Sequence, residues 1–192
     1  MILASLKPYY YYLIGERKKT IEIRKSDLKN LPQDVLFYMS KDEKSFKKIP
    51  KEFQEKYRKH FGKVGIEFTC DRIEMVNAKC SDYGIDLFYH DCFTKGCLTE
   101  REIEEYFNIP EDKDLRVMKG NGYAWHLSNL KIYDKPKELR EFYTILKSGS
   151  DCCFGCLWNA TPLDEMPCRT CTRERKYLSR PPQSYMFVEE VE

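Results

Sequence analysis

Within residues 18–24, the last four alternate between apolar and ionic side chains, and this pattern constrains the fold more than any other in the chain. Successive side chains of a β-strand point to opposite faces, so Ile21 and Ile23 are predicted to share one face and Glu22 and Arg24 the other. A carboxylate beside an arginine on one strand face can brace the guanidinium and leave donors for a ligand. The pattern therefore predicts the floor of a polar pocket. The simpler alternative is a half-exposed edge strand with a solvated ion pair.

The order Lys19-Thr20-Ile21-Glu22-Ile23-Arg24, after a helix-like segment closed by Gly15, resembles the signature of ASCH domains in the PUA-like superfamily. Residues 125–136 and 181–185 resemble a late strand and turn and the start of the final strand in bacterial and phage ASCH proteins. The three stretches follow one another in the family's order. Three residues separate Gly15 from Lys19 where the family has one, so a longer turn is expected before the strand.

The resemblance implies an α+β fold, namely a PUA-like mixed β-barrel with flanking helices, formed by a single domain of residues 1–192. It also implies a cleft beside strand 20–24 that binds RNA or a nucleotide-like ligand. Trp125 or Tyr123 could stack a base there, although Trp125 is equally typical of a core. We expect four residues to bind the ligand: Lys19, Glu22, Arg24 and Trp125.

An enzyme and a protein-binding adaptor are the alternatives. Some small ASCH proteins are amidohydrolases that act on acylated cytidine, and the chain is similar to them at Lys19. However, Glu22 stands where those enzymes have a threonine, and their downstream glutamate has no match here, so no catalytic residues are assigned. An adaptor would instead bind a protein partner through a zinc loop expected within residues 150–180 and the acidic helix expected at residues 100–107.

The charge of the chain is segregated, although its formal net charge is only +2. Residues 41–63 carry nine lysines or arginines against four acids, while residues 82–114 carry ten acids against three bases. The small net charge argues against tight non-specific DNA binding, and the asymmetry predicts a basic and an acidic side. Because the chain has neither a run of eighteen apolar residues nor a signal peptide pattern, we expect a soluble, cytoplasmic protein without membrane contact.

The nine cysteines include two CxxC pairs within a segment expected to be an insertion, residues 150–180, before the final strand. Two such pairs can supply the four corners of a tetrahedral Zn²⁺ site, which predicts a structural zinc loop. Cys152 could replace Cys153 as a ligand, and a redox dithiol is the alternative. Cys70, Cys80, Cys92 and Cys97 are expected as isolated thiols. The predicted zinc ligands are Cys153, Cys156, Cys168 and Cys171.

Four helices are expected from local signals. Pro8, Pro50 and Pro136 suit first helical turns, and Leu139, Phe142 and Leu146 follow Pro136 at helical spacing. Thr99 with Glu102 forms a capping box before a helix over residues 100–107. Apolar alternation predicts strands at residues 34–40, 62–78 and 123–127. His60, which follows the second helix, is expected at the surface.

Overall fold

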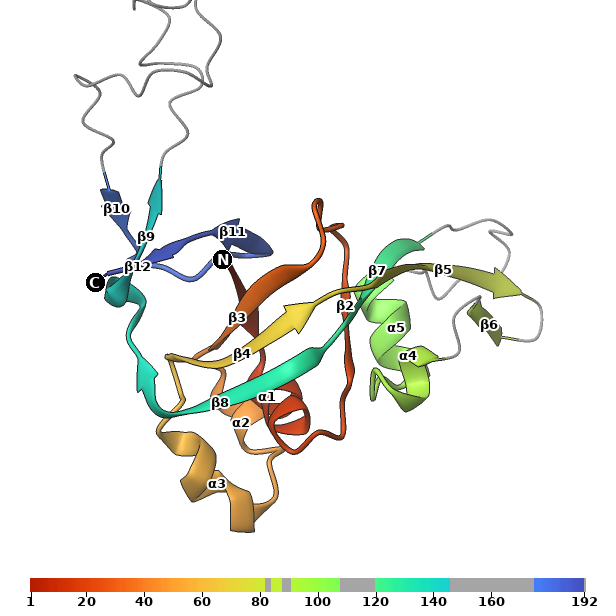
Figure 1. The fold of residues 1–192 in the computed structure, drawn as a ribbon. Helices are drawn as coiled ribbons and strands as arrows, with labels where there is room; N and C mark the ends of the chain where they lie inside the picture. Colours follow the sequence, from red (N-terminus) through yellow and green to blue (C-terminus); the bar gives the residue numbers. More distant parts are fainter. Residues whose placement is uncertain (82–83, 88–90, 108–119, 146–174, 192) are drawn as a thin grey trace, which may run out of the picture.

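The computed structural model describes residues 1–81, 84–87, 91–107, 120–145 and 175–191. Strands dominate this part of the chain, and short helices pack beside them (Figure 1). The α+β class predicted from the sequence is therefore confirmed. No helix among these residues is long and apolar enough to cross a bilayer.

The largest sheet has five strands in the order β11-β1-β3-β4-β8. The central strands β1 and β3 run parallel, and the other neighbours are antiparallel. Both central strands are apolar and buried on both faces, as expected for strands covered on each side. The strands are β1 (Ile2–Leu6), β3 (Gln33–Met39), β4 (Val64–Cys70), β8 (Ser128–Lys137) and β11 (Tyr185–Phe187).

A second sheet has four strands in the order β2-β7-β5-β6. The chain passes from β4 directly into β5 and from β7 directly into β8, so two long bent strands run through both sheets (Figure 1). The strand β2 pairs with β7 alone and forms an edge of this sheet. The strands are β2 (Ile21–Arg24), β7 (Gly120–His126), β5 (Ile73–Ser81) and β6 (Gly84–Leu87).

The expected β-barrel is not closed by the described strands. A closed barrel needs every strand to pair on both sides. In the described part of the chain, β2 is an edge strand of the four-stranded sheet, and β8 and β11 are the edge strands of the five-stranded sheet. The mixed sheet predicted from the resemblance is present, but its strands form open, bent sheets.

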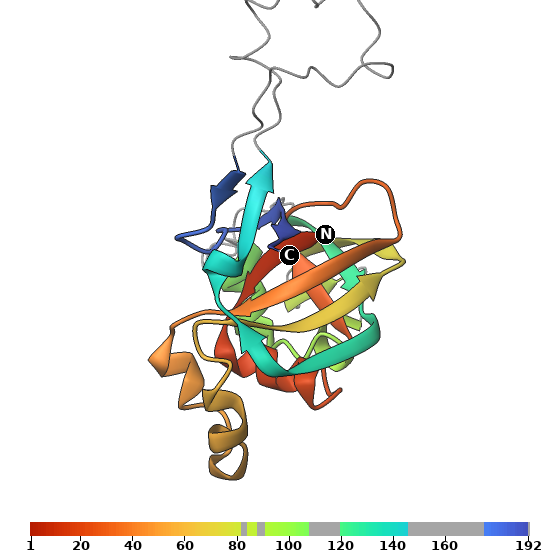
Figure 2. The ribbon, with the colours of Figure 1, turned by 60° about the vertical axis from the view of Figure 1, so that its left-hand side comes forward.

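A third sheet joins the end of the chain to the segment before the cysteine-rich stretch. It contains β9 (Phe142–Ile145), β10 (Arg175–Tyr177) and β12 (Glu189–Glu190), with β9 in the middle. Ile145 pairs with Arg175, so the chain leaves and rejoins the sheet at adjacent positions. This sheet lies at the opposite end of the molecule from the helix at residues 51–58 in both views (Figure 1 and Figure 2). The predicted zinc ligands lie in the sequence between β9 and β10, outside the described residues.

The helices expected at Pro8, Pro50 and residues 100–107 are confirmed. Thr99 and Glu102 form the predicted capping box, because the backbone N–H of each donates to the side chain of the other. The helices are α1 (Pro8–Gly15), α2 (Glu43–Phe46), α3 (Lys51–Arg58), α4 (Asp91–Thr94) and α5 (Glu100–Phe107).

The helix expected to begin at Pro136 was wrong. Pro136 lies in β8, which is an edge strand where a missing N–H removes no bond from the ladder. A capping box between Glu138 and Glu141 then closes a single 3-10 turn at Leu139–Glu141, and β9 follows. The apolar spacing that favoured a helix is explained by burial of Phe142, which is fully enclosed in a small core with Leu3 and Val64.

His60 is buried, which contradicts the expected surface position. Its side chain packs against Tyr11 and Tyr57, and its Nδ1 lies 3.0 Å from the Tyr11 hydroxyl. Burial, with lysines nearby, lowers the pKa of His60 to about 4. The imidazole is therefore a neutral core group at physiological pH.

Candidate functional site

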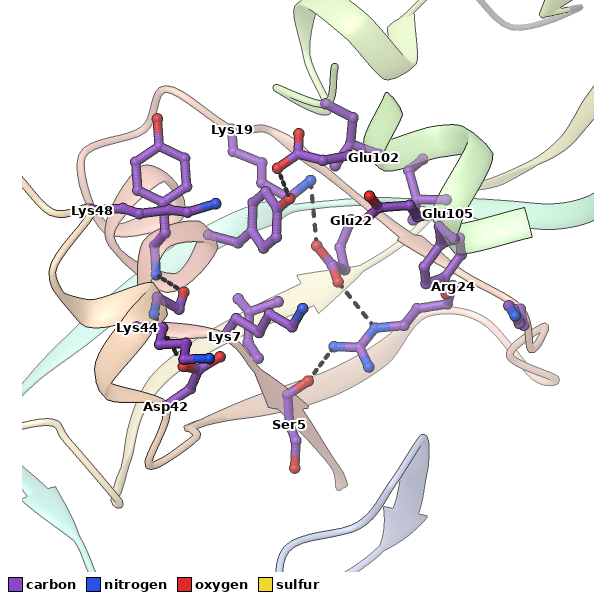
Figure 3. A pocket seen from close by; sticks show the side chains of 18 residues that line it. Ser5, Lys7, Lys19, Glu22, Arg24, Asp42, Lys44, Lys48, Glu102 and Glu105 are labelled. Atoms are coloured by element: carbon purple, nitrogen blue, oxygen red, sulfur yellow. Dashed lines mark hydrogen bonds and ion pairs between the residues drawn. The ribbon is translucent and has the colours of Figure 1, made fainter. Parts of the chain in front are cut away.

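A pocket of about 720 Å³ opens beside β2, between the start of α1, the helix α2 and the helix α5 (Figure 3). Six of its lining side chains are cationic and four are acidic, and three tyrosines contribute aromatic surface. Its volume lies within the range of small-molecule sites, which is about 300 to 1,000 Å³.

The strand β2 supplies the floor of this pocket, since Glu22, Ile23 and Arg24 all line it. Ile21 and Ile23 pack with α5 in one apolar cluster, whereas Glu22 and Arg24 lie on the opposite face. The predicted alternation is therefore confirmed. The alternative of a solvated ion pair was wrong, since Glu22 and Arg24 are only 7% and 8% exposed.

Lys19, Glu22 and Arg24 form a buried ionic triad, which we call the floor triad. Lys19 Nζ lies 3.4 Å from Glu22 Oε2, and Arg24 Nε lies 3.1 Å from Glu22 Oε1. One carboxylate therefore sits between two cations in a site largely removed from water. Such a charge-paired cluster is costly to bury unless its members are held in place.

Arg24 is held by backbone oxygens and by aromatic rings. Nη2 donates to the Ser5 carbonyl at 2.6 Å, and Nη1 donates to the Ser184 carbonyl at 3.4 Å. The guanidinium carbon lies 5.8 Å from the ring centroids of both Phe37 and Trp125, a cation–π distance. Nε is buried but makes no hydrogen bond within the described residues, because its N–H is poorly aligned with Glu22. The Arg24 guanidinium is thus fixed at the pocket floor by one ion pair and two backbone carbonyls.

Lys19 is also almost fully buried, with 2% of its surface exposed. Its Nζ donates to the Gly96 carbonyl at 2.5 Å and lies 5.4 Å from the Tyr10 ring centroid. Together with Glu22, these contacts fix an ammonium group at the edge of the pocket. An ammonium and a carboxylate in fixed contact can orient a polar ligand by charge-assisted hydrogen bonds.

The helix α5 contributes a tyrosine and two carboxylates that the resemblance did not predict. Tyr10 donates a hydrogen bond of 2.6 Å to Glu102, and burial together with this bond raises the pKa of Tyr10. Burial favours a higher pKa for Glu102, but the bonds from Tyr10 and Thr99 outweigh it and lower that pKa. Burial raises the pKa of Tyr106 to about 12. The wall therefore presents neutral phenols beside an ionised carboxylate.

Trp125 does not line the pocket. Its side chain is fully buried in the main core, its Nε1 donates to the Ser26 carbonyl, and its ring packs edge-on against Tyr185. Trp125 pairs directly with Glu22 across β2 and β7, so it lies on the predicted face but beneath the floor. The proposed stacking role for Trp125 is therefore replaced by a supporting one, under the guanidinium of Arg24.

Cys70, Cys92 and Cys97 are free thiols, and the described residues contain no group of metal-binding side chains. Burial raises the pKa of Cys70 to about 12 and that of Cys92 to about 11, so both are neutral thiols in the core.

Comparisons with known proteins give structural neighbours only. No family model matches the sequence, and no curated protein matches it. Among solved structures, the chain is similar to ASCH from Zymomonas mobilis, with 15% identity and a TM-score of 0.46 over 100% of this chain and 97% of that chain. It is also similar to a mutant form of that protein, with 15% identity and a TM-score of 0.42 over 72% of this chain and 75% of that chain. Both neighbours are ASCH proteins, the family that the sequence resembles.

Proposed function

We propose that the pocket beside β2 binds RNA or a nucleotide-like ligand. The observation that carries this proposal is the floor triad, where Lys19 and Arg24 hold cationic groups in fixed positions beside Glu22 in the pocket lining. Charged groups in fixed positions can orient a polar ligand by charge-assisted hydrogen bonds.

The rest of the lining suits the same ligand class. Tyrosine rings can stack on any nucleobase, and Tyr9, Tyr10 and Tyr106 all border the pocket. Lysines on the rim can attract a phosphate group as flexible point charges, without fixing its geometry. Single nucleotides or unpaired bases of RNA fit these features better than a duplex, whose bases are inaccessible to a closed pocket.

Binding of ribonucleotides and RNA to a variant that lacks a pocket aromatic ring tests the proposal. Short fluorescent single-stranded and hairpin RNAs, and the four ribonucleoside 5′-monophosphates, would be titrated against wild type, Tyr106→Leu and Tyr177→Leu. Tyr177 is 52% exposed and lies outside the pocket, so its variant is the matched control. Loss of one stacking ring should weaken binding by about 1 to 3 kcal/mol in Tyr106→Leu alone. The absence of binding by wild type would favour the adaptor hypothesis.

An amidohydrolase is a second candidate, and one observation favours it. Glu102 and Glu105 line the same pocket as Lys19 and Glu22. Two carboxylates downstream of Glu22 in the sequence are therefore present in the pocket, although neither could be matched to the amidohydrolases' glutamate from the sequence. Glu102, however, already accepts hydrogen bonds from Tyr10 and Thr99. A binding function therefore requires fewer rearrangements than a hydrolytic one.

A further inference from the structure

The charge segregation of the sequence converges on the pocket as two unlike walls. Lys44 and Lys48 come from the basic segment and lie on or beside α2, while Glu102 and Glu105 come from the acidic segment and lie on α5. Lys7, just before α1, adds a third cation on the side of the two lysines (Figure 3). A ligand in this pocket therefore meets a lysine wall on one side and an acidic wall on the other. The lysine wall includes one acid, Asp42, which caps α2 by accepting from the Ser45 N–H.

The lysine wall is free to bind an anion. Lys7, Lys44 and Lys48 are all exposed, and within the described residues none of them forms an ion pair. Lys48 is close enough to Glu102 to help keep that carboxylate ionised. By contrast, the side chains of the acidic wall already have partners: Glu102 accepts from Tyr10, and Glu105 pairs with Arg101 at 2.9 Å.

Two of the three pocket tyrosines lie near the acidic wall, while Tyr9 lies beside α2, where its N–H donates to Ser45 Oγ. Tyr106 lies on α5 itself, and Tyr10 is tied to α5 through its bond to Glu102. Two cations lie against these rings: Lys25 Nζ is 5.2 Å from the Tyr106 centroid, and Lys19 Nζ is 5.4 Å from the Tyr10 centroid. A planar base can therefore pack beside α5, where the carboxylates would repel a phosphate group.

We propose that the pocket binds a nucleotide in one orientation, with its phosphate against Lys7, Lys44 and Lys48 and its base against Tyr10 and Tyr106. This inference rests on the proposed nucleotide-binding function and adds the direction in which the ligand lies. It makes the phosphate a determinant of affinity, so a nucleoside 5′-monophosphate binds more tightly than the same nucleoside. The phosphate could belong to a free nucleotide or to the backbone of an RNA strand.

Calorimetric titration of matched ligands tests the orientation. The four ribonucleosides, their 5′-monophosphates and their 3′-monophosphates would be titrated against wild type, Lys44→Gln/Lys48→Gln and Lys47→Gln/Lys51→Gln. The last variant is the matched control, because it removes the same charge from exposed lysines next to α2 that do not line the pocket. The ratio of nucleoside Kd to nucleotide Kd is the quantity of interest.

Wild type and the control variant should bind the monophosphates at least about tenfold more tightly than the nucleosides, since phosphate contacts are charge-assisted. In Lys44→Gln/Lys48→Gln this ratio should fall to within about twofold of one, while nucleoside affinity is unchanged. A preference for 5′- over 3′-monophosphates would identify a free nucleotide, and equal affinity would indicate a strand backbone. If nucleotides bind but the ratio survives in the pocket double variant, the orientation is wrong and the proposed function stands. If neither nucleosides nor nucleotides bind wild type, the proposed function itself fails.

Discussion

Arg24 Nε lies 3.1 Å from Glu22 Oε1, and both side chains are about nine-tenths buried at the floor of the pocket. The same carboxylate lies 3.4 Å from Lys19 Nζ. Glu22 thus compensates two buried cations at once, and the geometry of the floor depends on it.

Replacing Glu22 should destabilise the fold markedly. Glu22→Gln removes the charge that offsets Lys19 and Arg24, and breaking a buried ion pair from one side costs about 3 to 5 kcal/mol. Denaturant unfolding of the variant measures this loss. Glu43→Gln is the control, because Glu43 pairs with Arg58 where both side chains are 53% exposed, and such pairs contribute about 1 kcal/mol or less. Equal effects of the two variants would show that the triad does not stabilise the folded protein.

Stability should fall as pH is lowered from about 6.5 toward about 4 because of His60. Its folded pKa of about 4 lies below the unfolded value of 6.5, so the unfolded state binds the extra proton throughout this window. The contribution of the neutral imidazole is therefore fully present above pH 6.5 and is lost on acidification. The difference in pH dependence between wild type and His60→Gln isolates this group, and it should be on the order of 2 to 3 kcal/mol across the window. Parallel curves would contradict the buried neutral state.

Protein purified without chelator should contain one Zn²⁺ per chain, held by Cys153, Cys156, Cys168 and Cys171. Metal analysis by mass spectrometry checks the stoichiometry. The Cys168→Ser/Cys171→Ser variant should lose the metal, whereas Cys97→Ser, a partly exposed thiol outside the two CxxC pairs, should retain it. Chelation should raise hydrogen exchange in residues 150–180 more than in the sheets, because ordering of a zinc loop is coupled to metal binding. Full zinc retention by the double variant would exclude this ligand set.

Acylated cytidine should not be turned over efficiently. The sequence resemblance aligns Glu22 with the threonine that the ASCH amidohydrolases use. Glu22 is already paired with Lys19 and Arg24. Chromatographic measurement of cytidine release from N4-acetylcytidine checks this. Multiple turnovers by wild type that are abolished in folded Lys19→Ala would instead support the amidohydrolase alternative.

The local part of the site could be predicted from the sequence, and the part formed by tertiary packing could not. Alternation along β2 placed Glu22 and Arg24 together, because side-chain direction in a strand follows from the backbone alone. The same parity put Trp125 on their face, but parity gives no depth, and Trp125 lies beneath the floor. Lys48 and Glu102 are 54 positions apart in the sequence, and tertiary contacts bring them to one pocket. Tyr9 and Tyr10 of α1 make two of these contacts, by hydrogen bonds to Ser45 in α2 and to Glu102 in α5.

The errors in secondary structure have a similar cause. Helical spacing after Pro136 reflected burial of Phe142 in a separate small core, which a strand satisfies equally well. His60 follows a polar, basic helix, so nothing in its neighbours along the chain indicated that Tyr11 and Tyr57 enclose it.

Titration of RNA against variants of Arg24 tests the central claim most directly. Labelled single-stranded RNA at low salt should bind wild type with modest, salt-sensitive affinity, and Arg24→Ala should lose about 1 to 3 kcal/mol of binding free energy. Arg24→Lys keeps the charge without the planar fork and should lose part of it. Lys56→Gln and Lys59→Gln are controls, because neither residue lines the pocket, and they should weaken binding less and reduce its salt dependence. Folding of each variant would be verified by circular dichroism. Binding curves for folded Arg24→Ala that coincide with wild type, or no binding by wild type at low salt, would contradict a ligand site built on the floor triad.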